Sequence, residues 1–287
     1  MIRQSRALAA LLTASFVGAA LAATVPEVVG IAAAVVNDVK FRNAQVSQAR
    51  AVALRQRIAL ADQIQTGQRS QLQLMLLDRS TLSVGANARL TIDRFVYSPT
   101  TGRSFSAAVA KGAFRFMSGR PNPQGASSIR SPVATIGIRG TIVDGVIGND
   151  AVDIAKGEPA IPRNTKSDTA TATMVILRGP GRQTQGHLTV GAITVTAADR
   201  TVELDQPMLA AYVPKSGVAP IGPFKISAQT LVKVQDLISP ALAQSRSGSS
   251  GLGKLLRALP SVGVGFGSGS PDSKSRPAQP GSSPGKP

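Results

Sequence analysis

The 287-residue sequence has no cysteine, no tryptophan and a single histidine, and aromatic residues make up only 3% of it. Without cysteine no disulfide can stabilise the fold, and the usual Cys and His metal sites cannot be assembled. The core has to be aliphatic, and we expect neither a metal nor another cofactor. Acidic residues are also few: 15 Asp and Glu stand against 32 Lys and Arg, giving a formal net charge of +17.

The N-terminus has the pattern of a cleavable signal peptide. Arg3 and Arg6 form a basic start, an apolar run covers residues 7–20, and Ala20-Leu21-Ala22 is a small-x-small motif of the kind that signal peptidase accepts. An uncleaved anchor is the alternative, but the run is shorter than the ~20 residues that span a bilayer. We expect residues 1–23 to be removed, which predicts a periplasmic or secreted protein without a transmembrane segment.

Most of the positive charge lies on residues 24–238. Outside the cytoplasm a basic surface meets anionic envelope polymers and lipid headgroups before it meets nucleic acid. We therefore expect an envelope protein or an anionic glycan as the partner, and no nucleic acid. A solvated surface that only keeps the protein soluble is the alternative.

Short apolar segments rich in Val, Ile and Thr, interrupted by Gly, Pro or Asn, predict an all-β fold. The clearest alternation covers residues 71–76, where leucine occupies every second position. Polar turns at 78–80 and 85–87 separate it from strands around Leu82 and Leu90. This spacing indicates a meander or a solenoid-like coil and excludes a parallel βαβ unit.

The remaining segments follow the same pattern. Residues 49–61 are interpreted as loop and short strand rather than helix, 120–128 and 158–169 as loops, and 198–200 as a turn. Residues 147–238 are either a small second lobe or a continuation of the same sheets. The other expected strands are 28–36, 105–109, 111–119, 142–147, 172–177, 187–196, 201–204 and 209–213.

From residue 239 the composition of Ser, Gly, Pro and basic residues predicts a disordered tail. One island has leucines at helical spacing, from Leu252 to Leu259, with Lys254 and Arg257 beside them. A basic amphipathic turn of this kind is a candidate for peripheral contact with a membrane surface. A fluctuating helix without such a contact is the alternative.

The stretch from Ser131 to Thr141 is apolar and β-branched, which predicts a buried strand. Pro132 lacks an amide donor and suits its start, while Gly137 and Gly140 mark a bend or a close backbone approach. Arg139 either bonds neighbouring carbonyls or faces an anionic partner. We favour the structural role, and we expect the stretch to be the closing strand of an array built from residues 72–116.

These motifs in series resemble the FecR domain family. A threonine-glycine turn, an alternating strand, an Asp-x-Ser turn and a Gly-x-Asn turn are followed by a basic-glycine-aromatic step and a strand ending in Gly-Ile-Arg-Gly-Thr. Residues 58–146 are similar to the family in this way, with Ser131 and Ala88 at positions where threonine and serine are usual. The motif residues are Thr66, Gly67, Asp78, Ser80, Gly85, Asn87, Gly112, Phe114, Pro132, Gly137, Arg139, Gly140 and Thr141.

The resemblance implies a short-stranded, solenoid-like or roll-like FecR domain that acts as a binding or sensing module, with mainly structural motif residues. Regulatory family members carry an anti-sigma segment and one transmembrane helix ahead of this domain, where the present sequence has a signal peptide. The expected organisation is a signal peptide (1–23), a β lead-in (24–57), the FecR domain (58–146), a β-rich part (147–238) and the tail (239–287).

Catalysis has little support in the sequence. His187 lies in an apparent strand, and no serine has a nucleophile-elbow context. Asp78, Asp93 and Asp144 could pair as acid and base, but each adjoins turn residues, where bonding to the backbone is the commoner role. We therefore expect a non-catalytic protein, with a structural surface or adhesin-type protein as the alternative to a sensing module. A glycan-cleaving enzyme is a third and weaker alternative.

Overall fold

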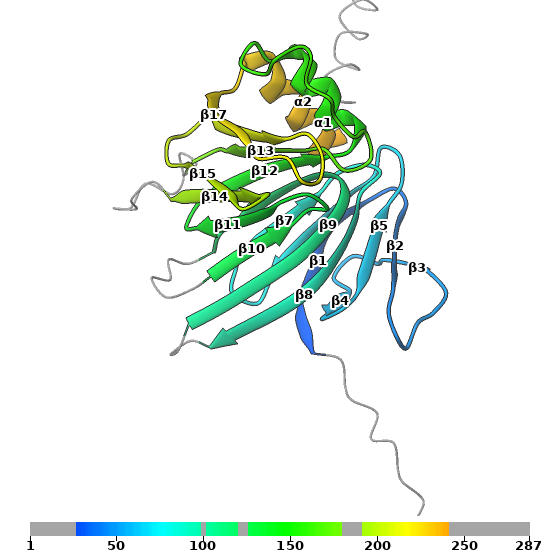
Figure 1. Cartoon of the computed structure of the whole chain (residues 1–287). Coiled ribbons are helices and arrows are strands. Elements are labelled where there is room, and N and C mark those ends of the chain that lie inside the picture. Colours follow the sequence, from blue (N-terminus) through cyan, green and yellow to red (C-terminus); the bar gives the residue numbers. More distant parts are fainter. Residues whose placement is uncertain (1–26, 99–101, 120–125, 180–190, 241–287) are drawn as a thin grey trace, which may run out of the picture. The chain divides into compact units, whose positions relative to one another are not determined.

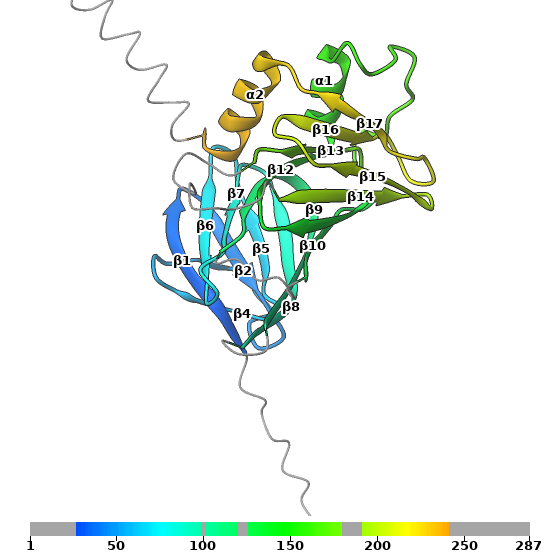
Figure 2. The ribbon, with the colours of Figure 1, turned by 90° about the vertical axis from the view of Figure 1, so that its left-hand side faces the viewer.

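The computed structural model describes residues 27–98, 102–119, 126–179 and 191–240. Within these residues the chain forms seventeen strands and two helices, and the strands lie in two layers (Figures 1 and 2). The expected roll-like β fold is therefore confirmed in its main feature. Neither helix is long and apolar enough to cross a bilayer.

The two layers, called sheet A and sheet B, share strand β9 (Gly102–Met117) and are antiparallel except where β9 pairs with β10. In spatial order the other strands of sheet A are β4 (Arg57–Ala59), β1 (Val28–Val36), β6 (Gln71–Leu76), β7 (Thr81–Val84), then past β9 β12 (Ile142–Ile147), β13 (Thr173–Leu177), β16 (Leu209–Val213) and β17 (Ile221–Lys225). Those of sheet B are β3 (Arg50–Ala51), β2 (Val39–Arg42), β5 (Gln63–Thr66), β8 (Arg89–Ser98), then past β9 β10 (Ala126–Arg130), β11 (Thr135–Arg139), β14 (Ala192–Ala197) and β15 (Arg200–Leu204).

Strand β9 passes from one layer to the other at Gly112. Residues before it pair with β8 and β10, and residues from Gly112 onward pair with β7 and β12. Gly112 has φ +90°, and a Cβ there would lie 2.4 Å from the Cβ of Ala88. Both the dihedral angle and the space require glycine. The sequence predicted two strands here, and the structure shows one bent strand.

The main core fills the space between the layers, as the alternation predicted. Leu72 and Leu74 of β6 are fully buried, and Leu90 of β8 is 1% exposed. Phe105 and Phe116 lie on the two parts of β9, and their rings stack with centroids 4.9 Å apart. The few aromatic residues thus concentrate where the shared strand bends and help to hold the layers together.

A second core lies on the other side of sheet A, under α1 (Asn149–Gly157) and α2 (Ala228–Ile238), which Figure 2 shows beside β12, β13 and β16. The sequence did not predict either helix. Glu158 is only 2% exposed, and its carboxylate accepts hydrogen bonds from Ser227 Oγ at 2.8 Å and from Thr230 Oγ1. A carboxylate at the N-terminus of α2 is also stabilised by the helix dipole. Because Glu158 directly follows α1, these hydrogen bonds connect the two helices.

Several expectations are corrected by the structure. Residues 126–128 belong to β10 and not to a loop, β17 was not predicted, and the stretch from 131 to 141 does not close the array. Its strand β11 pairs with β10 and β14, and both sheets continue beyond it through residues 142–225. The stretch does not pair with β9, because β9 already pairs with β10 in sheet B and with β12 in sheet A. His187 and the residues from 241 lie outside the described part of the chain.

The local turn chemistry is confirmed. The short strands β3 and β4 occupy residues 49–61, without a helix. Ala198 and Asp199 have φ values of 48° and 57° between β14 and β15, which is the geometry of a tight two-residue hairpin. Arg79 and Asn87 also have positive φ values, at the two turns predicted on either side of β7.

Candidate functional site

Thr66 joins the end of β5 to the turn that precedes β8. Its Oγ1 donates a hydrogen bond to the carbonyl of Gly85 at 2.6 Å and accepts one from the amide of Ala88 at 2.9 Å. The carbonyl of Gly67 accepts from the amide of Asn87 at 3.0 Å. Through these hydrogen bonds, the buried Thr66 hydroxyl and the backbone of Gly67 hold the turn after β5 against the turn between β7 and β8.

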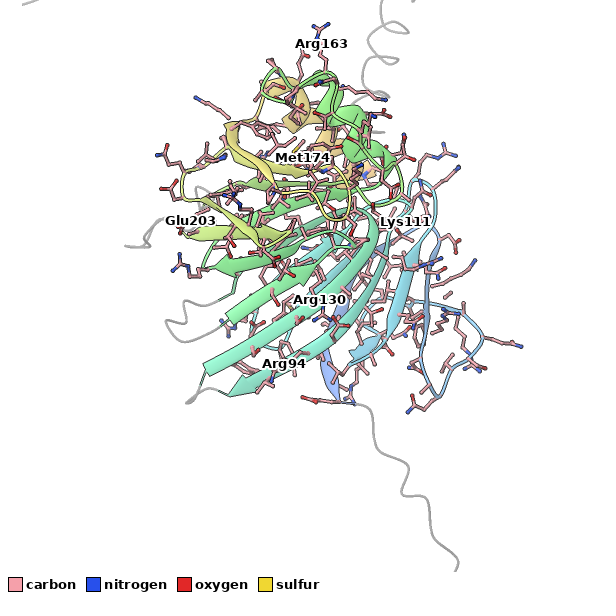
Figure 3. The ribbon with its side chains drawn as sticks, in the orientation of Figure 1. Arg94, Lys111, Arg130, Arg163, Met174 and Glu203 are labelled. Carbon is pink, nitrogen blue, oxygen red and sulfur yellow. The ribbon has the colours of Figure 1, made fainter. Side chains whose placement is uncertain are left out.

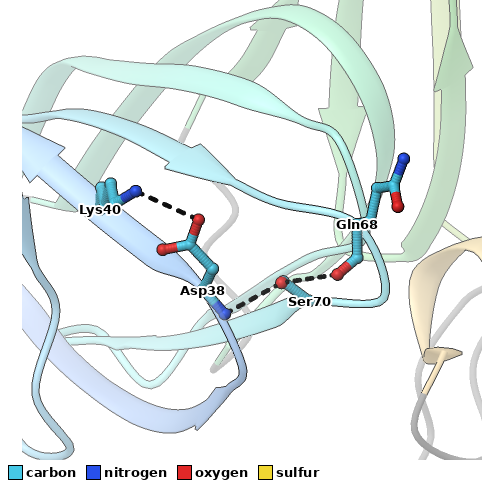
Figure 4. Close-up of polar contacts among 4 residues, drawn as sticks. All are labelled: Asp38, Lys40, Gln68 and Ser70. Carbon is cyan, nitrogen blue, oxygen red and sulfur yellow. Dashed lines mark hydrogen bonds and ion pairs between the residues drawn. The ribbon is translucent and has the colours of Figure 1, made fainter.

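The turn after Gly67 also packs on the turn between β1 and β2 (Figure 4). The amide of Gly67 donates to the carbonyl of Asp38 at 2.8 Å, and a Cβ on Gly67 would lie 3.2 Å from the Cβ of Asp38. Ser70 Oγ accepts from the Asp38 amide at 3.1 Å and donates to the Gln68 carbonyl at 3.0 Å. The Asp38 carboxylate pairs with Lys40 at 3.2 Å, with both side chains at least half exposed.

Gly85 provides a close approach for the end of α2. A Cβ at this position would lie 2.0 Å from the carbonyl oxygen of Leu237, and the amide of Ala86 donates to that same carbonyl at 3.3 Å. The glycine of the Gly-x-Asn turn therefore has a packing role that its turn geometry alone does not reveal.

The Asp-x-Ser turn between β6 and β7 is a buried polar cluster. The Asp78 carboxylate accepts from the Ser80 amide at 2.9 Å and from Ser80 Oγ at 2.7 Å, and Ser80 Oγ accepts from the Gly119 amide at 2.9 Å. Asp78 is 3% exposed and Ser80 is fully buried. This geometry anchors the end of β9 to the turn and leaves the carboxylate engaged.

Phe114 and Gly137 are packing positions. Phe114 is fully buried, and a Cβ on Gly145 of the neighbouring strand would lie 2.2 Å from its ring. Gly137 lies directly opposite Thr194, whose Oγ1 would be 2.5 Å from a Cβ at 137. The small residue in each pair makes room for the side chain across the strand.

The last motif positions surround β11. Pro132 is exposed in the bend before the strand, and Arg139 pairs with Glu203 at 2.9 Å, with side chains 70% and 55% exposed. Gly140 has φ +59°, and the Thr141 amide donates to Ser118 Oγ at 3.3 Å. Arg139 therefore makes an exposed cross-strand ion pair instead of bonding buried carbonyls.

Asp144 is the centre of a buried ion cluster on the outer side of sheet A. It is fully buried, and both its oxygens accept from Arg115, at 2.6 and 2.8 Å, while Arg178 Nε lies 3.7 Å away. The hydrogen bond from Arg115 to Asp144 raises the pKa of that arginine, although burial opposes the shift. Asp144 is thus committed to two guanidinium groups.

The structure does not bring the three considered carboxylates together. Asp93 lies on β8 in sheet B and pairs with Arg130 at 2.6 Å, Asp144 lies on β12 in sheet A, and Asp78 is held in its turn. An acid and base pair of these residues is therefore not formed. Among the described residues no three His, Cys, Asp or Glu side chains are grouped to hold a metal ion.

The outer side of sheet B gathers positive charge. We call this surface the basic face. Arg94 and Arg130 lie on the same side of β8 and β10, and Lys111 lies at the bend of β9 (Figure 3). The members of the basic face are Lys40, Arg42, Arg89, Arg94, Lys111, Arg130 and Arg139.

Within the basic face, Arg89 and Lys111 are partners in the pairing of β8 with β9, next to a bulge between Arg89 and Leu90. Both are exposed, and Gln65 is the cross-strand neighbour of Arg89 on β5, with Lys40 beyond it on β2. Like charges at directly opposed positions repel and destabilise a sheet. Among the described residues, no acidic side chain pairs with either Arg89 or Lys111.

The sequence could not identify this surface, because the alternation within a strand does not reveal which residues face each other across strands. The signal it did contain was the excess of basic residues in the body. The register of β8 and β9 places two of these basic residues, Arg89 and Lys111, opposite each other.

Residues 62–158 match the sequence profile of a family described as FecR protein. This part of the chain is a FecR domain. The resemblance inferred from the turns and the Gly-Ile-Arg-Gly-Thr strand is thereby confirmed, and the match extends past β12 to the end of α1 and Glu158. The matched residues contact α2 at both of its ends, through Gly85 and Ala86 near Leu237 and through Glu158 at Ser227.

Two crystal structures of a proposed anti-sigma factor from Parabacteroides distasonis, at 1.65 and 2.50 Å resolution, are similar to the chain. Their identities are 11% and 12%, and both TM-scores are 0.39. The similar regions cover 60% and 59% of this chain and 64% and 62% of the two structures, so the chain spans less than two thirds of their length. No curated protein matches the chain.

Proposed function

We propose that the protein is an exported, non-catalytic FecR-domain module of the cell envelope that binds an anionic partner through the basic face of sheet B. The signal-peptide pattern supports export to the periplasm or beyond the cell. The family supports a role in binding or sensing, and a link to envelope signalling follows from that family rather than from any single residue.

The observation that carries the proposal is the opposition of Arg89 and Lys111 without a neighbouring acid. Elsewhere on the basic face the cations Lys40, Arg130 and Arg139 each have an ion-pair partner. An unneutralised pair costs stability in the free protein, and an anionic group placed between the two side chains removes that repulsion. The pair is therefore better suited to binding than to folding.

The arrangement of the row favours an extended ligand. Lys40, Gln65, Arg89 and Lys111 occupy four neighbouring strands, which at about 4.8 Å per strand gives a row of about 14 Å. Tyr97 is the one exposed aromatic side chain of the described residues. Neutral sugars are commonly held by aromatic stacking, so charge favours an envelope glycan that carries carboxylate or phosphate groups.

The experiment is co-sedimentation of the purified full chain with isolated envelope glycan, compared with capture of envelope proteins on the same immobilised chain. The test variant carries Arg89→Glu and Lys111→Glu. We expect glycan binding by the unmodified chain that weakens with added salt, because exposed charges are screened, and a loss of most of that binding in the variant.

The matched control carries Lys215→Glu and Lys225→Glu, which change the net charge equally on exposed positions that do not belong to the basic face. Its binding should remain close to that of the unmodified chain. Equal losses of glycan binding in both variants would show that binding depends on net charge alone. Retained binding in the test variant would overturn the proposal. If the immobilised chain captures a protein and not glycan, and the test variant loses this capture, the partner is a protein.

A structural surface protein is the second candidate. Sheet A runs without interruption from β4 to β17 and sheet B from β3 to β15, and the two share β9, as a rigid spacer would require. In this case residues 239–287 would attach the body to the cell. Deletion of these residues should then release the protein from the cell surface, and unchanged localisation would remove the candidate.

A further inference from the structure

We propose that the cavity between α1 and the loop of residues 158–169 binds a small amphiphilic anion, a carboxylate or phosphate group attached to a short hydrocarbon body. The cavity has a volume of about 600 Å³, within the range of small-molecule sites. It lies at the end of the FecR match and beyond it, away from the basic face.

Hydrogen bonds within the loop and to the residues around it fix its backbone. The Asp168 amide donates to the carbonyl of Pro214 at 2.8 Å, and its carboxylate accepts from the Ala170 amide at 2.9 Å and from Thr171 Oγ1 at 2.7 Å. The amide and hydroxyl of Thr165 both donate to the Pro162 carbonyl. Because these bonds fix the backbone of the loop, the cavity is formed before a ligand enters.

The floor of the cavity is apolar. Val152 and Ala155 of α1 line it together with Ile161 of the loop, and they are 6%, 4% and 6% exposed. A hydrocarbon body placed on this floor would lose contact with water on one side, which gains roughly 25 cal/mol per Å² of buried apolar area.

The polar groups of the cavity favour a negative head group. Ser167 Oγ accepts a hydrogen bond from the hydroxyl of Tyr212 at 2.7 Å, so its own proton can be donated to a ligand. Burial raises the pKa of Tyr212, which keeps the phenol protonated as the donor in this bond. No carboxylate lines the cavity among the described residues.

Lys156 supplies the positive charge. Its Nζ lies 3.1 Å from Asp153, but the two side chains are 71% and 55% exposed, and such surface pairs exchange partners at little cost. Arg163 also lines the cavity, while its side chain extends away from the body (Figure 3). The ammonium and the hydroxyl of Ser167 are therefore the two donors for one anionic head group.

The experiment follows amide chemical shifts of the full chain during titration with octanoate. Acetate has the same head group without the hydrocarbon body, and octylammonium has the same body with the opposite charge. Octyl phosphate distinguishes a phosphate from a carboxylate head group. We expect octanoate or octyl phosphate to shift the amides of Ser167 and Thr169, and we expect weak effects from acetate and octylammonium.

Four variants make the test specific. Ser167→Ala and Lys156→Ala should each weaken octanoate binding, by about tenfold for a lost hydrogen bond to a charged group. Thr169→Trp should fill the exposed mouth without touching the apolar floor. Lys166→Ala removes a neighbouring exposed charge that does not line the cavity, and it should leave binding unchanged.

The proposal is overturned by equal shifts with octanoate and octylammonium, by shifts that fall elsewhere in the chain, or by unchanged affinity in both Ser167→Ala and Lys156→Ala. Folding of each variant is checked from its amide spectrum, and Thr169→Trp still tests the cavity if Ser167→Ala perturbs the loop. These outcomes are independent of glycan binding at the basic face.

Discussion

The outer sides of the two sheets differ in how their basic residues are paired. On sheet A, Arg115 faces a strand that carries Asp144, and the ion cluster is largely buried next to the helical cover. On sheet B, Arg89 faces Lys111 on a bare surface. Sheet B also carries exposed ion pairs, at Arg130 and Arg139, but its opposed cations on β8 and β9 have no acidic partner among the described residues. This contrast is the main argument for a binding role of sheet B.

The largest expected effect comes from removing the anion of sheet A. Asp144→Asn leaves Arg115 and Arg178 with no carboxylate in a partly buried place, and loss of one partner of a buried ion pair costs about 3–5 kcal/mol. Chemical denaturation measures the change. Asp93→Asn breaks the more exposed pair with Arg130 and should cost about 1 kcal/mol or less. Equal losses in the two variants would remove the contrast between buried and exposed pairs.

The next effect concerns the strand that the two sheets share. Gly112→Ala places a Cβ against Ala88 at a φ of +90°, and the resulting overlap should destabilise the fold by about 1–3 kcal/mol. Gly140→Ala is a suitable control, because its φ is also positive at +59° but nothing lies within 4 Å of the added atom. The difference between their free energies of unfolding isolates the steric part. A control as costly as Gly112→Ala would contradict the crossover role.

A smaller effect, of opposite sign, is expected on sheet B. Lys111→Glu converts the opposed cations into an opposite-charge pair with Arg89, and such cross-strand pairs contribute roughly 0.2–1 kcal/mol. The variant should therefore unfold at higher denaturant concentration than the unmodified chain. Added salt should shrink the difference, because both side chains are exposed. A destabilised variant would show that Lys111 has a favourable partner in the free protein.

The smallest effect is a pH dependence of stability that comes from the loop between α1 and β13. Hydrogen bonds from the Ala170 amide and then from Thr171 lower the pKa of Asp168. An acid with a lowered pKa in the folded state adds stability above its unfolded pKa of about 3.9 and loses it as the pH falls through the folded value. Asp168→Asn should therefore lower the melting temperature at neutral pH, and the gap to the unmodified chain should close in acid. A gap that stays constant down to pH about 2 would exclude this linkage.

The sequence was sufficient for features that depend on neighbouring residues in the chain. Alternation at 71–76 identified the buried leucines, and the Asp, Ser, Gly and Asn turns bend where their side chains and positive φ values require it. The motif series was sufficient for the family. These features are local, so one chain segment contains all the information they need.

Features that depend on distant partners were not predictable in this way. The pairing of Arg89 with Lys111 follows from the register of β8 and β9. The strand β11 does not have its expected position at the edge of the array, because β12 pairs with β9. The helix α1 has few apolar residues and is stabilised by the sheet beneath it. Glu158 reaches Ser227, the N-cap of α2, only through a contact 69 residues away. Tertiary contacts decided each of these.

The most direct measurement of the central claim compares glycan binding by Lys111→Glu and Lys225→Glu, two exposed single charge reversals on sheet B and sheet A. The account predicts that Lys111→Glu binds less envelope glycan while being at least as stable as the unmodified chain, and that Lys225→Glu binds normally. Unchanged binding by Lys111→Glu, or an equal loss in both variants, would contradict the account.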